Sequence, residues 1–192
     1  MTQRFRQAEG GRIDRQTPLT FTFNDKRYQG YRGDTLASAL LANNVHLVGR
    51  SSKYHRPRGI IGSGTEEPNA LVQLEKDAYT SPNYLSTEIE LYEGLIAKSI
   101  NCWPSVKYDL IAITKLLLRF MTPGFYYKTF MWPKKFWRKY EYFLRRLSGL
   151  GVSPDQLDPD RYDKINTHCD VLVVGGGPAG LAAALEAGRT GA

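Results

Sequence analysis

The feature that most constrains this chain of 192 residues is a glycine-rich stretch close to its last residue. Four apolar residues at 171–174 precede the sequence Gly175-Gly-Gly-Pro-Ala-Gly180, and an alanine-rich run follows it. A short apolar run rich in valine predicts a buried parallel strand, and the alanines predict a helix. Residues 168–192 therefore predict the first β-α unit of an α/β Rossmann-type dinucleotide-binding domain, which is incomplete here.

The residue types at the turn match what a bound pyrophosphate requires. Gly175 permits a tight turn, Gly177 lets the backbone approach the phosphates, and Gly180 lets the helix pack close to the strand. A proline suits the first helical turn, where its missing N–H breaks no hydrogen bond. Free amides and the positive end of the helix dipole would face the phosphates. The predicted cofactor-binding residues are Gly175, Gly176, Gly177, Pro178, Ala179 and Gly180.

The motif leaves two questions open. A glycine-rich turn that binds nothing is the alternative to a nucleotide site. An acidic residue about 20 positions further on would bind a ribose hydroxyl, and the sequence reaches Ala192 before that position. NAD and FAD are therefore both candidates. Because a lone β-α unit leaves both faces of its strand uncovered, we expect this chain to be the N-terminal piece of a longer polypeptide.

Residues 19–92 predict a small α+β domain of the β-grasp type. The alternation at 19–23, the turn residues after it and the extended pattern at 27–31 predict a β-hairpin. Asp34 is predicted to cap a helix that Asn43 and Asn44 close. Further strands are predicted at 45–48, 69–75 and 86–91, with a loop at 49–64. A hairpin, a helix and further strands form the outline of a β-grasp sheet with one helix across it.

The other segments differ in composition. Residues 1–18 are polar without an apolar period, which predicts a disordered lead-in. Residues 93–151 form an aromatic and basic segment with a predicted amphipathic helix at 134–147. Prolines and aspartates at 152–167 predict a linker.

Charge and hydropathy narrow the expected partners. Residues 103–151 hold ten of the 26 Lys and Arg residues but two of the 19 acidic ones. In the helix predicted at 134–147 the aromatic side chains lie on the face opposite the basic side chains. Nucleic-acid binding needs aromatic and basic side chains interleaved on one surface, so we expect no nucleic-acid partner. No signal-peptide pattern is visible, and no stretch reaches the roughly 20 apolar residues of a spanning helix. We expect a cytoplasmic protein without a membrane partner.

Cysteine and histidine positions predict no metal site. Cys102 and Cys169 are too far apart in sequence for a C-x-x-C motif, and two thiols do not make a four-thiolate iron–sulfur site. His46, His55 and His168 show no metal-ligand spacing with each other or with the cysteines. Any redox chemistry is therefore expected from an organic cofactor.

Several separated motifs give the chain a family resemblance. From about residue 19 onward it resembles the N-terminal part of the α subunits of heterotetrameric sarcosine oxidases. The resemblance rests on GRSSKYHRPRG at 49–59, EEPNA at 66–70, WPS at 103–105, GFYYKTFMWP at 124–133 and HCDVLVVG at 168–175.

The resemblance implies a [2Fe–2S] ferredoxin-like fold for the N-terminal unit and NAD at the glycine motif of the α subunit. It implies FAD in the β subunit, FMN at the α/β interface, and β, γ and δ subunits as partners. The implied reaction is oxidative demethylation of sarcosine to glycine, with O2 reduced to H2O2 and the one-carbon unit passed to tetrahydrofolate. Because substrate oxidation belongs to the β subunit, no catalytic residue is assigned here, and this part alone is expected to be inactive.

Related complexes that oxidise proline, hydroxyproline or opines share this layout, and several keep cysteines in the ferredoxin-like unit. Residues 45–75 contain no cysteine, so we predict a domain without an iron–sulfur cluster. A related amine dehydrogenase subunit and a non-catalytic electron-transfer or docking module are the alternative functions.

Two groups of residues have an open role. The basic loop could clamp an anion or be a solvated loop; its residues are Lys53, His55, Arg56 and Arg58. The aromatic cluster could line a flavin interface or belong to a core; its residues are Tyr126, Tyr127, Phe130, Met131 and Trp132.

Overall fold

The structure is a computed structural model, which describes residues 3–52, 54–116, 133–147 and 149–191. The chain divides into two compact units, Met1–Asp158 and Pro159–Ala192. Among the described residues, no helix combines the length and the apolar character needed to cross a lipid bilayer.

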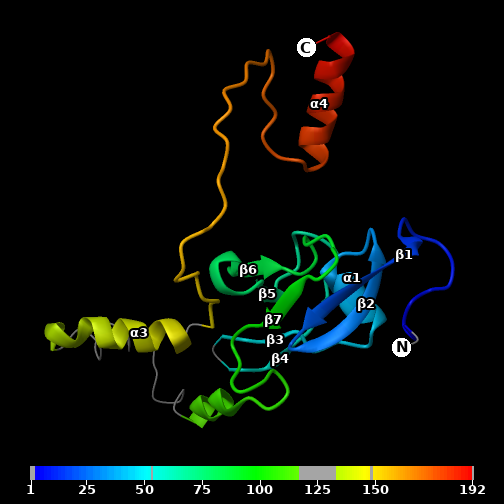
Figure 1. The fold of residues 1–192 in the computed structure, drawn as a ribbon. Helices are drawn as coiled ribbons and strands as arrows, with labels where there is room; N and C mark the ends of the chain where they lie inside the picture. Colours follow the sequence, from blue (N-terminus) through cyan, green and yellow to red (C-terminus); the bar gives the residue numbers. More distant parts are fainter. Residues whose placement is uncertain (1–2, 53, 117–132, 148, 192) are drawn as a thin grey trace. The chain divides into compact units, whose positions relative to one another are not determined.

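A mixed five-stranded sheet forms the centre of the first unit (Figure 1). The strands lie in the order β2-β1-β7-β5-β6, and β1 and β7 run parallel while the other neighbours run antiparallel. Their bounds are β1 Asp14–Phe23, β2 Lys26–Arg32, β5 Leu71–Leu74, β6 Ser81–Leu85 and β7 Ile96–Ser99. This sheet with helix α1 (Leu36–Ala42) has the β-grasp-like arrangement that the sequence predicts.

The predicted hairpin is confirmed. β1 and β2 meet at a two-residue turn, where Phe23 pairs with Lys26. Asn24 and Asp25 both have positive φ, 49° and 62°. Asparagine and aspartate tolerate the left-handed region, and a turn with two such residues matches the twist of the strands.

Helix α1 begins one residue later than the sequence predicts. Thr35 is its N-cap: the Thr35 side chain accepts a bond from the Ser38 amide, and Ser38 Oγ accepts one from the Thr35 amide. This capping box satisfies two amides at once. Asp34 instead is buried and pairs with Arg6, with Oδ2 2.6 Å from the guanidinium. The end of the helix at Asn43 is as predicted.

The core lies between helix α1 and one face of the sheet. β1 contributes Phe21 and Phe23, both at most 1% exposed, because alternate residues of a strand point to the same face. The helix and the later strands supply the other large buried groups, among them Leu36, Leu40, Val72 and Leu95.

Three sequence expectations for this unit are wrong. Ordered structure begins before residue 19, since β1 starts at Asp14. Residues 45–48 and 86–91 are not strands; the sheet instead uses β6 and, beyond residue 92, β7. β6 contains a proline and an asparagine, which is tolerated because it is an edge strand.

A second small sheet and several helical turns complete the first unit. β3 (Gly49–Arg50) pairs with β4 (Pro57–Arg58). The short helices η1 Asp77–Tyr79, η2 Leu110–Leu116 and η3 Lys134–Phe136 precede α3, Trp137–Leu147, which confirms most of the helix predicted at 134–147.

The second unit contains one helix, α4 (Pro178–Thr190), among its described residues. The strand predicted at 171–174 does not form, and Val174 is 88% exposed. A parallel strand needs a neighbour to receive its backbone hydrogen bonds. The described residues of this unit supply no such neighbour.

Candidate dinucleotide site and the 49–59 loop

The glycine turn has the backbone that the sequence predicts. Gly175 has φ of +110°, a value that a side chain disfavours. Gly177 is the N-cap of α4. It has no side chain that could accept a capping hydrogen bond, and Pro178 lies in the first turn of the helix. The turn therefore leads directly from the apolar run at 171–174 into a helix.

Gly180 is needed for close packing inside the turn. A Cβ added at Gly180 would lie 2.0 Å from the carbonyl oxygen of Gly175 and 3.5 Å from Cγ1 of Val173. The first distance is far below van der Waals contact. The turn can therefore approach its own helix this closely only because residue 180 has no side chain.

Gly176 and Gly177 face open space within the described residues. A Cβ at either position would meet no heavy atom within 4 Å. The Leu181 amide donates to the Gly177 carbonyl at 2.9 Å, so the amides of Ala179 and Gly180 precede the first intrahelical bond of α4. Open space beside amides at a helix N-terminus fits a pyrophosphate.

The sequence leaves the 49–59 loop open between an anion clamp and a solvated loop, and among its described residues His55 takes neither role. His55 is buried, and its Nδ1 lies 2.6 Å from Oδ2 of Asp109. Arg56 lies over the Tyr54 ring at 4.9 Å, and Arg58 is exposed on β4. Lys53 lies outside the described residues. The histidine of the supposed clamp is thus used inside the protein.

The Arg50 side chain joins this loop to a segment 56 positions further along the chain. The Arg50 guanidinium donates from Nη1 to the His55 carbonyl at 3.1 Å. It also donates from Nε to the Val106 carbonyl at 2.8 Å and from Nη2 to the Lys107 carbonyl at 3.2 Å. The loop and residues 106–109 are therefore held together by both Arg50 and the His55–Asp109 pair.

The EEPNA motif has a structural role. Glu67 is buried, and its carboxylate accepts from the amides of Ile61, Gly62 and Asn69. Burial acts to raise the pKa of the Glu67 carboxyl, but the backbone amides outweigh it and the pKa is lowered. The Glu67 side chain thus closes the turn that follows β4.

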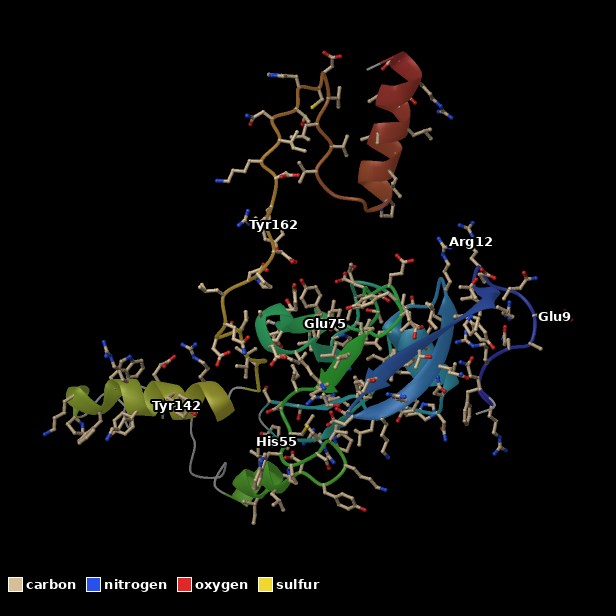
Figure 2. All side chains as sticks on the ribbon, viewed as in Figure 1. Glu9, Arg12, His55, Glu75, Tyr142 and Tyr162 are labelled. Carbon is tan, nitrogen blue, oxygen red and sulfur yellow. The ribbon has the colours of Figure 1, made fainter. Side chains whose placement is uncertain are left out.

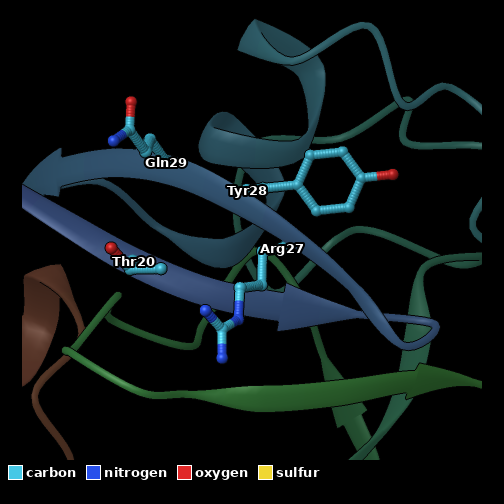
Figure 3. A pocket seen from close by; sticks show the side chains of 4 residues that line it. All are labelled: Thr20, Arg27, Tyr28 and Gln29. Carbon is cyan, nitrogen blue, oxygen red and sulfur yellow. The ribbon is translucent and has the colours of Figure 1, made fainter. Parts of the chain in front are cut away.

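An open hollow on the β1-β2 hairpin is lined by Thr20, Arg27, Tyr28 and Gln29 (Figure 3). Burial raises the pKa of the Tyr28 hydroxyl, so the phenol stays neutral around pH 7. The lining has one cation and three neutral polar groups. It contains no pairing of an acid with a base that would support catalysis.

Comparison with known proteins shows what the chain is similar to. A model of the family described as "2Fe-2S iron-sulfur cluster binding domain" matches residues 16–102. The chain is 56% identical over 189 residues to the sarcosine oxidase subunit alpha of Rhizobium meliloti (strain 1021). The chain is homologous to the N-terminal part of the sarcosine oxidase α subunit. The resemblance seen in the sequence is confirmed.

The match covers 98% of this chain and 19% of the Rhizobium α subunit. Sarcosine oxidase α subunits of Corynebacterium sp. strains P-1 and U-96 are 37% and 36% identical, over 97% of this chain and 15% of their own length. The chain therefore spans less than one fifth of these relatives. A solved structure, L-proline dehydrogenase from P. horikoshii, aligns with 48% of the chain and 17% of its own length at 22% identity, with a TM-score of 0.36.

The thiols of this chain do not fit the [2Fe–2S] cluster in the description of the matching family. A [2Fe–2S] cluster of the ferredoxin type needs four thiolates, and residues 16–102 contain one cysteine, Cys102. Burial, with a smaller effect of Asp109, raises the pKa of the Cys102 thiol to about 11. Within the described ranges, no three His, Cys, Asp or Glu side chains are arranged to hold a metal ion. A domain without a cluster remains a prediction.

Sequence reasoning missed the contacts between distant segments. No local sequence pattern links His55 to Asp109 or Arg6 to Asp34. A charged residue beside an apolar run, such as Asp34 before Leu36, is a weak signal of a buried ion pair. The aromatic cluster of Tyr126, Tyr127, Phe130, Met131 and Trp132 lies outside the described residues.

Proposed function

We propose that this chain is the N-terminal part of the α subunit of an amine-oxidising flavoenzyme of the sarcosine oxidase type. The observation that carries the proposal is 56% identity over 98% of the chain to a sarcosine oxidase subunit alpha. Identity at this level over separate motifs supports a shared role more strongly than a glycine motif alone.

The proposed reaction is the oxidative demethylation of sarcosine to glycine, with O2 reduced to H2O2 and the one-carbon unit passed to tetrahydrofolate. Substrate oxidation is assigned to another subunit. This part of the α subunit binds a dinucleotide and contributes to subunit assembly.

The glycine turn is the proposed dinucleotide site, formed by residues 175–180. A nicotinamide or flavin dinucleotide supplies hydride-transfer chemistry when bound. The chain's own contribution is to bind the pyrophosphate: amides at the N-terminus of α4 donate to phosphate oxygens, and the missing side chain at Gly177 leaves room for them. NAD is the first candidate and FAD the second.

The activity is tested on the full-length subunit, expressed and purified together with its partner subunits. Hydrogen peroxide release and the reduction of an added electron-accepting dye are measured with sarcosine, proline and hydroxyproline as separate substrates. The proposal expects sarcosine to give the highest kcat/KM and glycine as product. If the complex oxidises proline but not sarcosine, the chain would instead be assigned to a related amine dehydrogenase. A purified complex that oxidises no amine would contradict the enzymatic function.

A further inference from the structure

Two loops of the first unit are locked side by side. The Arg50 guanidinium binds the carbonyl of His55 on one loop and those of Val106 and Lys107 on the other, at 2.8–3.2 Å. The buried His55–Asp109 pair joins the same two loops at 2.6 Å (Figure 2, where His55 is labelled). The backbones of the two loops are therefore fixed relative to each other by the Arg50 side chain and the His55–Asp109 pair.

The side chains that these loops expose are aromatic and cationic. On one loop Arg56 lies over the Tyr54 ring at 4.9 Å, and on the other Lys107 lies over the Tyr108 ring at 5.5 Å. Tyr54, Trp103 and Tyr108 are 43%, 61% and 68% exposed. Large aromatic groups exposed on two loops that are held to each other indicate a binding surface rather than a core. We call these five residues the paired-loop surface.

The charge of the paired-loop surface is uncompensated. Arg56 and Lys107 are exposed, and the ion pairs formed among the described residues include neither. The one acidic residue of the two loops, Asp109, is buried in the pair with His55. Electrostatic complementarity therefore requires an acidic partner surface.

We propose that the paired-loop surface docks against an acidic surface of another subunit of the oxidase. The proposal rests on the proposed function, which places this chain in a multi-subunit enzyme. Tyrosine, tryptophan and arginine are the residues enriched at interfaces between separate proteins. The contacts of Arg50 and the His55–Asp109 pair fix the two loops before binding. Fewer conformations are then lost on docking, which lowers the conformational-entropy cost of binding.

Photo-crosslinking in the assembled enzyme tests the proposal. A benzoyl-phenylalanine is placed at Tyr108 of the full-length subunit, and separately at Tyr79, which is 53% exposed on η1. We expect irradiation to join position 108 to an Asp- and Glu-rich peptide of a second subunit, with a lower yield from position 79. Crosslinks from 108 confined to the same subunit, equal yields at both positions, or crosslinks to co-purified nucleic acid would overturn the proposal.

Charge reversal gives a second readout. Arg56→Glu with Lys107→Glu should weaken binding of the α subunit to its partner subunit about tenfold or more. Lys26→Glu with Lys76→Glu, two other exposed lysines, is the matched control and should leave the affinity unchanged. Melting temperature and dinucleotide affinity should stay at the wild-type level in both. Equal assembly of both variants overturns the docking surface alone, whereas a wild-type chain that binds no subunit overturns the proposed function.

Discussion

His55 and Asp109, 54 positions apart in the sequence, form a buried pair with Nδ1 2.6 Å from Oδ2. Asp109 Oδ1 also accepts from the amides of Trp103 and Ile111. One carboxylate thus organises the segment after β7 and fastens it to the β3-β4 hairpin. In a unit whose thiols do not fit a metal cluster, polar contacts of this kind hold the loop in place.

Removing Asp109 should destabilise the first unit and release this segment. Asp109→Ala leaves a buried histidine without its partner and is expected to cost about 3 kcal/mol of unfolding free energy. Hydrogen exchange on the full-length protein should show lost protection at residues 49–58 and 101–111. The control is Asp155→Ala, which removes an exposed carboxylate and should cost little. Unchanged exchange at both segments would contradict a structural role for the pair.

Glu67 should make the loop at 60–69 sensitive to acid. The folded-state pKa of Glu67 lies below the reference value of 4.5, so its contribution to stability is present above pH 4.5 and is lost as the pH falls through the lower folded-state pKa. Glu67→Gln should lower stability by about 1–3 kcal/mol at pH 7, and the difference from wild type should shrink below pH 4.5. Urea unfolding at pH 3 to 7 measures this. Exposed Glu88→Gln is the control, and a pH-independent difference for Glu67→Gln would contradict the argument.

Two glycines of α4 should respond differently to alanine. At Gly180 the added Cβ would lie 2.0 Å from the Gly175 carbonyl oxygen, so the turn must open and dinucleotide affinity should fall. At Gly188 the added Cβ meets nothing within 4 Å of the described chain, and alanine should stabilise the helix by up to about 1 kcal/mol. Nucleotide titration and thermal unfolding of both full-length variants make the comparison. Equal affinities would show that close packing at Gly180 is unimportant.

The hairpin and helix α1 could be predicted from local patterns. The alternation at 19–23 and the apolar spacing from Leu36 to Leu41 depend only on residues within the same strand or helix. The pairing of β7 with β1 was not predictable in the same way. β7 has four residues, Ile-Ala-Lys-Ser, and its position depends on a parallel partner more than 70 positions earlier. Residues 86–91 alternate like a strand, yet buried Ser86 and Thr87 lie in a turn.

In the candidate site too, local conformation could be predicted from the sequence and contacts between distant residues could not. The glycine turn is contiguous in sequence, so its conformation and the start of α4 could be predicted from residue types. The strand predicted before it does not form, since the described part of the second unit contains no strand that pairs with residues 171–174. The sequence left the basic loop open between an anion clamp and a solvated loop, because the burial of His55 beside Asp109 is a tertiary property that a loop sequence does not reveal.

Dinucleotide titration of the full-length subunit carrying Gly177→Val tests the central claim most directly. A side chain at the N-cap would occupy the space through which a pyrophosphate approaches the amides of α4. The account predicts affinity for NAD, or for FAD, at least about tenfold below wild type, with the melting transition of the first unit and amine oxidation by the assembled enzyme retained. Gly188→Val, on the same helix with open space around it, should keep wild-type affinity. Wild-type affinity of Gly177→Val for both nucleotides would contradict the assignment of the glycine turn as the dinucleotide site.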